Sequence, residues 1–139
     1  KISYYHQLPA IHPVQDNYAS SSGFGYRKDP FSRKYTFHSG DDFSARVGTP
    51  VVSTGEGRVK TSKVNGSFGN YIEIDHGNGF TTIYAHLSRR HVKKGQKVFR
   101  GQKIGEVGNT GRSTAPHLHY EVKYGRKSLD PSQYYFDSL

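Results

Sequence analysis

The sequence has 139 residues and contains no cysteine. Without thiols the chain forms neither a disulfide framework nor a thiolate metal site. Any metal ion bound by this domain must therefore sit on histidine, aspartate or glutamate side chains. The missing cysteine is neutral about the compartment in which the protein works.

Methionine is also missing, even at position 1, and we expect the chain to begin inside a longer precursor. No run approaches the roughly 18 apolar residues of a transmembrane helix, and no signal-peptide pattern opens the chain. We therefore expect any export signal, membrane anchor or regulatory segment to lie outside this sequence. A chain of 139 residues can bury a core without cross-links, which favours a single domain.

Acidic side chains are scarce, because 11 Asp and Glu stand against 20 Lys and Arg and leave a net charge of +9. A surface this basic favours a polyanionic partner, either a nucleic acid or an anionic cell-wall polymer. The sequence has no zinc-finger spacing, no basic region with heptads and no aromatic RNA-binding pattern, so we expect no nucleic-acid partner. The dense basic run from Arg89 to Lys94 precedes Gly95, and we interpret it as a solvated loop.

Helical periodicity is absent from every stretch of ten or more residues, whereas short apolar and β-branched runs alternate with glycine. The clearest pattern is a hairpin with strands over 71–75 and 80–87. Its turn contains Asn78-Gly79, which supplies the positive-φ residues that tight hairpins need. We predict a mainly β, compact single domain built of antiparallel sheets.

Residues 1–20 differ from the rest, because aromatic and aliphatic side chains surround two prolines there. This composition predicts an extended arm across the domain, without a helix, and we interpret it as the trimmed end of a longer protein. The domain itself is then expected to span residues 21–139.

The strand predicted over residues 116–122 carries His117 and His119 on one face and Leu118 and Tyr120 on the other. Two imidazoles roughly 6 to 7 Å apart either both reach one metal ion or flank its reaction centre. A strand also carries two solvent-facing histidines by chance, and the spacing alone does not choose among these arrangements.

A second motif lies upstream, where His38 and Asp42 stand four residues apart and converge if the chain turns at Gly40. With one histidine of the 117/119 pair they form a set of two histidines and one carboxylate with an open fourth position, as in catalytic zinc sites. Such a site activates water and polarises a carbonyl, which is the chemistry of amide hydrolysis. The other histidine of the pair is then placed to bond the attacking water or the oxyanion.

A third motif, Tyr84-Ala85-His86-Leu87, ends the predicted hairpin and places His86 among apolar neighbours. One interpretation is a histidine that caps the edge of the core, and the other is a catalytic group.

In order and approximate spacing, these three motifs resemble the lysostaphin and LytM type of zinc metallopeptidase, which cuts peptide bonds in bacterial peptidoglycan. The likeness covers roughly residues 11–135, and the three motifs together are specific although each alone is weak. Supporting matches are Ser22-Gly23-Phe24-Gly25-Tyr26-Arg27, Gly48-Thr49-Pro50-Val51, Gly69-Asn70-Tyr71, Asp75-His76-Gly77-Asn78-Gly79 and Gly108-Asn109-Thr110-Gly111.

The resemblance implies an antiparallel β domain with a narrow groove over one zinc ion. It also implies roles for particular residues: the zinc ligands are His38, Asp42 and His119, the catalytic residues that do not bind the metal are His86 and His117, and the candidate groove residues are Asn70 and Tyr84. The chain departs from the family pattern at Asp41, where an apolar residue is usual, and at Lys28-Asp29-Pro30, where many members have a histidine before the proline.

We therefore expect a zinc-dependent endopeptidase that hydrolyses peptide bonds in peptidoglycan, and we favour D,D cross-links between stem peptides as its substrate. It is expected outside the cytoplasm, in the periplasm or cell envelope or as a secreted protein. Two alternatives stay open: an endopeptidase of glycine bridges, and a non-catalytic LytM-like domain that binds the wall and activates another hydrolase. Loss of metal ligands would indicate the second alternative, but every ligand position is filled here.

Overall fold

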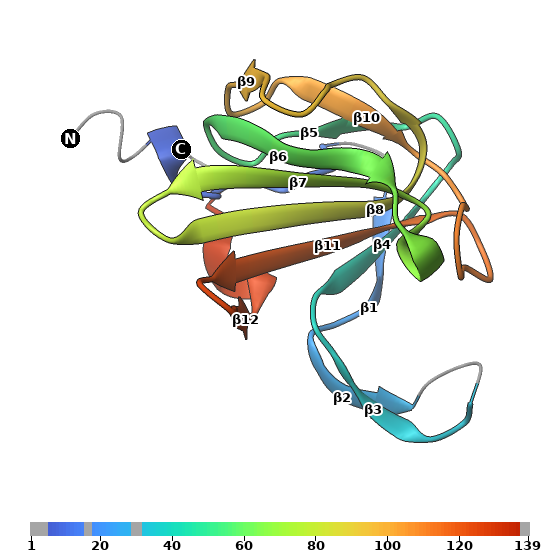
Figure 1. Cartoon of the computed structure of the whole chain (residues 1–139). Helices are drawn as coiled ribbons and strands as arrows, with labels where there is room; N and C mark the ends of the chain where they lie inside the picture. The colour runs from blue at the N-terminus through green and yellow to red at the C-terminus, as the bar shows by residue number, and fades with distance from the viewer. Residues whose placement is uncertain (1–5, 16–17, 29–31, 137–139) are drawn as a thin grey trace.

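A long, curved β-sheet dominates the computed structural model, which describes residues 6–15, 18–28 and 32–136 (Figure 1). The strands are β1 Tyr18–Ser22, β2 Gly25–Lys28, β3 Tyr35–His38, β4 Asp41–Ala45, β5 Pro50–Val52, β6 Gly57–Val64, β7 Asn70–Gly77, β8 Phe80–Arg90, β9 Lys97–Val98, β10 Lys103–Val107, β11 His117–Tyr124 and β12 Lys127–Leu129. Two single-turn 3₁₀ helices complete the order, η1 Gly66–Phe68 and η2 Pro131–Tyr134.

The main sheet runs in the order β1-β4-β11-β8-β7-β6-β9, with β12 beside β11 and the β5–β10 pair attached through β10 to β8. All of these pairs are antiparallel. The β7–β8 hairpin turns at Asn78 and Gly79, whose φ angles of 52° and 88° lie in the left-handed region. The predicted antiparallel β architecture is confirmed.

The two faces of the sheet bury different side chains. One face forms the main core, which includes Ile72, Ile74, Tyr84, Leu118 and Tyr120, each fully buried. The opposite face carries a smaller apolar cluster and the histidines of β11. The predicted alternation along β11 is therefore present, because its even positions enter the core.

The N-terminal arm follows the edge of the core. The N–H of Ala10 donates to the carbonyl of Thr54, and the N–H of Val52 donates to the carbonyl of Pro13. His6 and Gln7 are helical, so the prediction of an arm without a helix is wrong there. The strand β1 crosses the expected boundary between residues 20 and 21 because it pairs with β4.

The β2–β3 hairpin forms a separate two-stranded sheet that projects from the body of the domain (Figure 1). Its strand β3 ends at His38, so this hairpin leads directly into the motif of His38 and Asp42. Within the described ranges, no helix combines the length and the apolar character needed to cross a bilayer.

Candidate metal centre

A short connection between β3 and β4 brings the first motif onto β11. Asp42 pairs with His119 across the β4–β11 ladder. Between the strands, Gly40 passes so close to β11 that a Cβ atom there would collide with the carbonyl oxygen of Tyr120. Gly40 is thus required for close approach rather than for the backbone freedom that the sequence suggested, because its φ is not positive.

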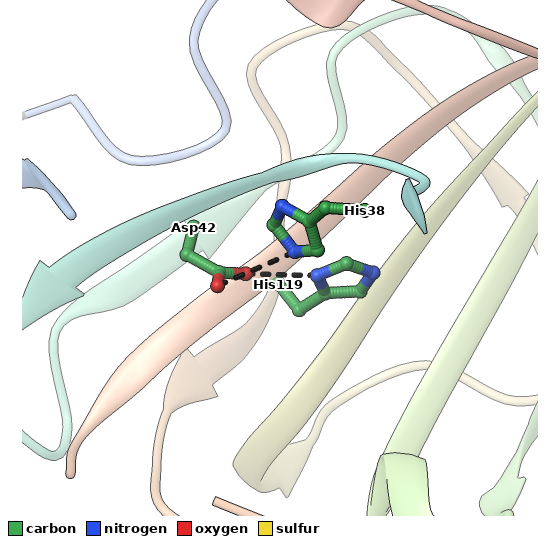
Figure 2. Close-up of side chains that lie close together, drawn as sticks. All are labelled: His38, Asp42 and His119. Atoms are coloured by element: carbon green, nitrogen blue, oxygen red, sulfur yellow. Dashed lines mark hydrogen bonds and ion pairs between the residues drawn. The ribbon is translucent and has the colours of Figure 1, made fainter. Parts of the chain in front are cut away.

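The three residues predicted as ligands meet at one point on the face opposite the main core (Figure 2). Each offers a ligand atom, and these atoms all lie within 4.8 Å of one another. The Nδ1 of His119 is 2.8 Å from Oδ1 of Asp42, and the Nε2 of His38 is 3.4 Å from Oδ2 of the same carboxylate. Two imidazoles and one carboxylate form a donor set that zinc uses in catalytic sites, so the residues present fit this metal.

A backbone carbonyl fixes the orientation of His38. Its Nδ1 lies 2.8 Å from the carbonyl oxygen of Gly23. Because a carbonyl only accepts hydrogen bonds, Nδ1 carries a proton, and Nε2 is the ring nitrogen that faces the carboxylate of Asp42.

The ring of His119 lies between two buried carboxylates. Its Nδ1 faces Asp42, and its Nε2 lies 2.7 Å from Oε2 of Glu121. Burial opposes the charged imidazolium, but the bonds to both carboxylates outweigh it and raise the pKa of His119 to about 9. Burial also opposes the charge of Asp42, yet its bonds to His119 and His38 hold the pKa of that carboxyl well below its usual range.

Glu121 was not identified from the sequence as part of the site. It is 4% exposed, accepts a hydrogen bond of 2.8 Å from the hydroxyl of Ser39, and holds the far nitrogen of His119. Carboxylates in this position fix the tautomer and orientation of a metal-binding histidine. The available signal was its spacing, because residues i and i+2 of a strand share a face and Glu121 follows His119 by two.

A β-bulge turns His86 toward the same centre. Between paired positions, β7 has one residue, Tyr71, where β8 has two, Ala85 and His86. His86 has a φ of 63°, which is rare outside glycine and typical of bulged residues. Regular alternation would place His86 on the core side with Tyr84, so the bulge explains how it reaches the other face.

The ring of His86 lies beside that of His117, with 4.7 Å between ring centroids. The Nδ1 of His86 donates to the carbonyl of Thr110 over 2.7 Å, so Nε2 is the nitrogen on the other side of the ring. Burial lowers the pKa of His86 to about 4, so the ring is neutral at pH 7. The strand β8 continues to Arg90, so the prediction that His86 ends the hairpin strand is wrong.

The loop that holds His86 is positioned by close glycine contacts. A Cβ at Gly111 would collide with the amide nitrogen of Gly69 and with the carbonyl of Ser67. The hydroxyl of Thr110 donates to the carbonyl of Leu87 over 2.7 Å. The Gly108-Asn109-Thr110-Gly111 motif therefore supplies a fixed carbonyl to a site histidine.

His117 completes the group of four histidines. Its Nδ1 lies 2.9 Å from the carbonyl oxygen of Ala115 and 3.0 Å from the hydroxyl of Ser113. Its Nε2 faces the carboxylate of Asp42 at 3.8 Å. His117 thus borders the three-residue set without belonging to it.

The prediction that Tyr84 lines the substrate groove is wrong. Its side chain is fully buried in the main core. Its hydroxyl accepts hydrogen bonds from the N–H of Thr54 at 3.1 Å and from the hydroxyl of Thr82 at 2.8 Å. The bulge separates Tyr84 from His86, so two residues of one motif lie on opposite faces of the sheet.

Asn70 remains a candidate groove residue. It is half-buried, and its side-chain N–H donates to the carbonyl of Leu87 over 2.9 Å. Its backbone N–H donates to the hydroxyl of Thr110, which places it beside the loop that holds His86.

Asp41, the unexpected acid before Asp42, points to the core face. It accepts hydrogen bonds from the N–H of Phe24 at 3.0 Å and from the hydroxyl of Tyr135 at 2.9 Å. It therefore ties the start of β4 to the loop before β2 and to the C-terminal segment, and it takes no part in the ligand set.

A model for peptidase family M23 matches residues 36–131. The chain belongs to this peptidase family. Peptidoglycan DD-endopeptidase ShyA of Vibrio cholerae is 48% identical over 112 residues, which are 80% of this chain and 26% of that protein. The chain thus spans about a quarter of the length of this relative.

Solved structures of M23 peptidases share the fold. A zinc-containing peptidase from Vibrio cholerae matches with a TM-score of 0.81 and 43% identity, over 87% of this chain and 38% of that chain. The catalytic domain of lysostaphin from Staphylococcus simulans matches with a TM-score of 0.77 and 33% identity, over 84% of this chain and 90% of that chain. The resemblance predicted from the three motifs is confirmed.

Proposed function

We propose that this chain is the catalytic domain of a zinc-dependent endopeptidase that hydrolyses peptide bonds of bacterial peptidoglycan, at D,D cross-links between stem peptides. One observation carries the proposal: three histidines lie around Asp42 with a fourth beside them, and each of the four has a ring nitrogen held by an oxygen acceptor of the surrounding structure. The substrate class is supported by ShyA, a relative named a peptidoglycan DD-endopeptidase. Because that polymer lies outside the cytoplasm, the cell envelope is the proposed place of action.

In this proposal the metal ligands are His38 through Nε2, His119 through Nδ1 and the carboxylate of Asp42. When bound, a zinc ion acts as a Lewis acid toward a carbonyl and lowers the pKa of a bound water toward neutrality. Glu121 keeps the proton on Nε2 of His119, which makes Nδ1 the ligand atom and strengthens it as a donor.

His86 and His117 are proposed to move the proton. Their Nδ1 atoms donate to backbone carbonyls, so each neutral ring presents an Nε2 lone pair. Such a nitrogen accepts a proton from the attacking water and can then donate it to the departing amine or to the oxyanion of the substrate. The fixed ring positions provide the orientation that proton transfer requires.

Hydrolysis of a defined substrate tests this function. The zinc-loaded domain is offered a purified D,D cross-linked muropeptide dimer and, separately, pentaglycine, and the products are identified by mass spectrometry. We expect cleavage of the dimer into monomers. Cleavage of pentaglycine alone would support the glycine-bridge endopeptidase and overturn the substrate, whereas cleavage of neither by a zinc-loaded domain would favour the wall-binding activator.

A further inference from the structure

A basic hollow lies where β6, β7 and β8 meet the loop after β8. Its volume is about 430 Å³, within the usual range of ligand sites. Its lining includes the cationic residues Arg89, Arg90, Lys93 and Lys94 together with Ser62 and Asn70. The sequence suggested a solvated loop for this basic run, but Arg89 and Arg90 belong to β8, which carries them into the hollow.

Neutral side chains hold Arg90 in place. Its Nε donates to Oδ1 of Asn70 over 3.0 Å, and its Nη1 donates to the hydroxyl of Ser62 over 3.2 Å. The Ser62 hydroxyl in turn donates to the carbonyl of Val92 over 2.8 Å. A guanidinium has five N–H donors, so these two bonds orient the group and leave three donors for a ligand.

Acidic groups are missing from the lining of this hollow among the residues that the structure describes. In that part of the chain, Arg90 has no carboxylate partner. The neighbouring acid Glu106 is already paired with His91 at 2.8 Å and with Lys103 at 3.3 Å. The hollow thus combines an oriented guanidinium with further positive charge, an arrangement that fits a carboxylate or a phosphate.

Hydrogen bonds connect the hollow to the candidate metal centre. Asn70 accepts from Arg90 through its side chain, and its backbone N–H donates to the hydroxyl of Thr110 over 3.1 Å. The carbonyl of Thr110 holds His86. Arg90 follows His86 by four residues on β8, a separation of roughly 10 to 13 Å along a strand, or three to four residues of an extended peptide.

We propose that the Arg90 hollow is an anion subsite that binds a free carboxylate of the peptidoglycan stem peptide, three to four residues from the scissile bond. This inference rests on the proposed function and adds a determinant of substrate choice. Stem peptides end in carboxylates, and a guanidinium fork binds such a group through two parallel hydrogen bonds. Arg90 is accordingly a residue for specificity, and its contribution appears in substrate binding rather than in the chemical step.

Steady-state kinetics of Arg90→Gln test the subsite with two substrates, the D,D cross-linked dimer and the same dimer with its free carboxylates converted to amides. We expect KM for the carboxylate dimer to rise about tenfold with kcat unchanged, because Gln replaces the charged guanidinium fork with a neutral amide. On the amidated dimer, we expect the variant and the wild type to be equal. Arg126→Gln is the matched control, because Arg126 is exposed in the turn between β11 and β12 and should leave both values unchanged.

The possible outcomes separate this inference from the proposed function. If the wild type cleaves both dimers equally well and Arg90→Gln matches Arg126→Gln, the subsite is overturned while the hydrolase stands. An equal loss on both dimers also overturns it, because Arg90 would then act by positioning Asn70 and Thr110. If Arg90→Gln weakens binding of poly(glycerol phosphate) but not of the carboxylate dimer, the hollow binds a phosphate polymer instead. A wild type that cleaves neither dimer contradicts the proposed function itself.

Discussion

Two clusters of buried polar side chains lie on opposite faces of one sheet, and both contain buried histidine. On the core side, Nδ1 of His76 bonds the carbonyl of Glu56 at 2.9 Å and Nε2 bonds the hydroxyl of Thr82 at 2.7 Å. The chain of hydrogen bonds continues through Tyr84 and Thr54. On the other side, His38, His86 and His117 each use one nitrogen on a backbone carbonyl and turn the second toward the centre.

The difference distinguishes a histidine whose hydrogen bonds are all structural from the histidines of the candidate site. Both nitrogens of His76 are satisfied by neutral partners, and burial lowers its pKa to about 4, so it has no capacity left for a ligand. The histidines of the candidate metal centre are held just as firmly, but His38, His117 and His119 each keep a nitrogen near the carboxylate of Asp42, and the ring of His86 lies beside that of His117. A buried histidine indicates a site when its fixed hydrogen bonds leave one nitrogen directed at a shared point.

The largest effect is expected from alanine substitutions at the proposed ligand His119 and at its neighbour His117 on β11. His119→Ala should lose zinc and activity together, whereas His117→Ala should keep zinc and lose activity by on the order of a hundredfold to a thousandfold. Metal analysis of the purified variants and hydrolysis of the muropeptide dimer measure both effects. Equal loss of zinc in the two variants would show that the roles of the pair are assigned wrongly.

A smaller effect is expected when the carboxylate behind His119 loses its charge. Glu121→Gln keeps an acceptor of similar size, and zinc affinity should fall by tenfold to a hundredfold because His119 becomes a weaker donor. A competition titration with a chelator measures the affinity. Glu73→Gln is the control, since Glu73 bonds Tyr71 and pairs with Lys60 rather than with a histidine. An unchanged affinity in Glu121→Gln would remove Glu121 from the site.

The buried histidine of the core, His76, should make the free energy of unfolding depend on pH. Its folded pKa of about 4 lies below the ordinary 6.5, so the unfolded chain binds more protons between these values and stability falls as pH drops through that window. Between pH 7 and pH 5 this group should remove about 2 kcal/mol from the free energy of unfolding. Urea unfolding with a chelator present compares the wild type with His76→Gln, which should show a smaller loss. Identical pH dependence in the two proteins would contradict a buried neutral His76.

The smallest effect is a change in apparent zinc affinity of about tenfold per pH unit, which follows from proton release at the candidate metal centre. Without metal, His119 has a pKa of about 9 and is protonated at neutral pH, so a zinc ion must displace the proton on Nδ1. The apparent zinc affinity should rise with pH and level off above pH 9. Calorimetry in buffers of different ionisation enthalpy counts the protons, and release of none at pH 7 would mean that His119 is already neutral.

Spacing predicted which side chains lie near one another, and the resemblance of the three motifs to a known family predicted their roles. The period of two along a strand placed His117 and His119 together, and the turn at Gly40 brought His38 to Asp42. The β7–β8 hairpin could also be predicted, because Asn78-Gly79 is typical of a tight turn. Glu121 was open to the same argument, since it follows His119 by two residues and shares its face of the strand.

The position of Tyr84 could not be predicted from spacing. It stands two residues before His86, and a regular strand would put both on one face, yet the bulge sends Tyr84 into the core and His86 toward the metal centre. A bulge depends on how two strands pair, and no local pattern in β8 records it.

The sequence by itself determined the antiparallel strands and the face that His117 and His119 share, because strand alternation and turn chemistry depend on neighbours along the chain. Only the tertiary structure decided which oxygen acceptor holds each histidine of the candidate site, that Glu121 supports His119, and that Arg90 is oriented without an acidic partner in the described chain. These features depend on hydrogen bonds between segments such as Gly23 with His38 and Thr110 with His86. Contacts between residues so distant along the chain arise only once the sheet has brought its strands together.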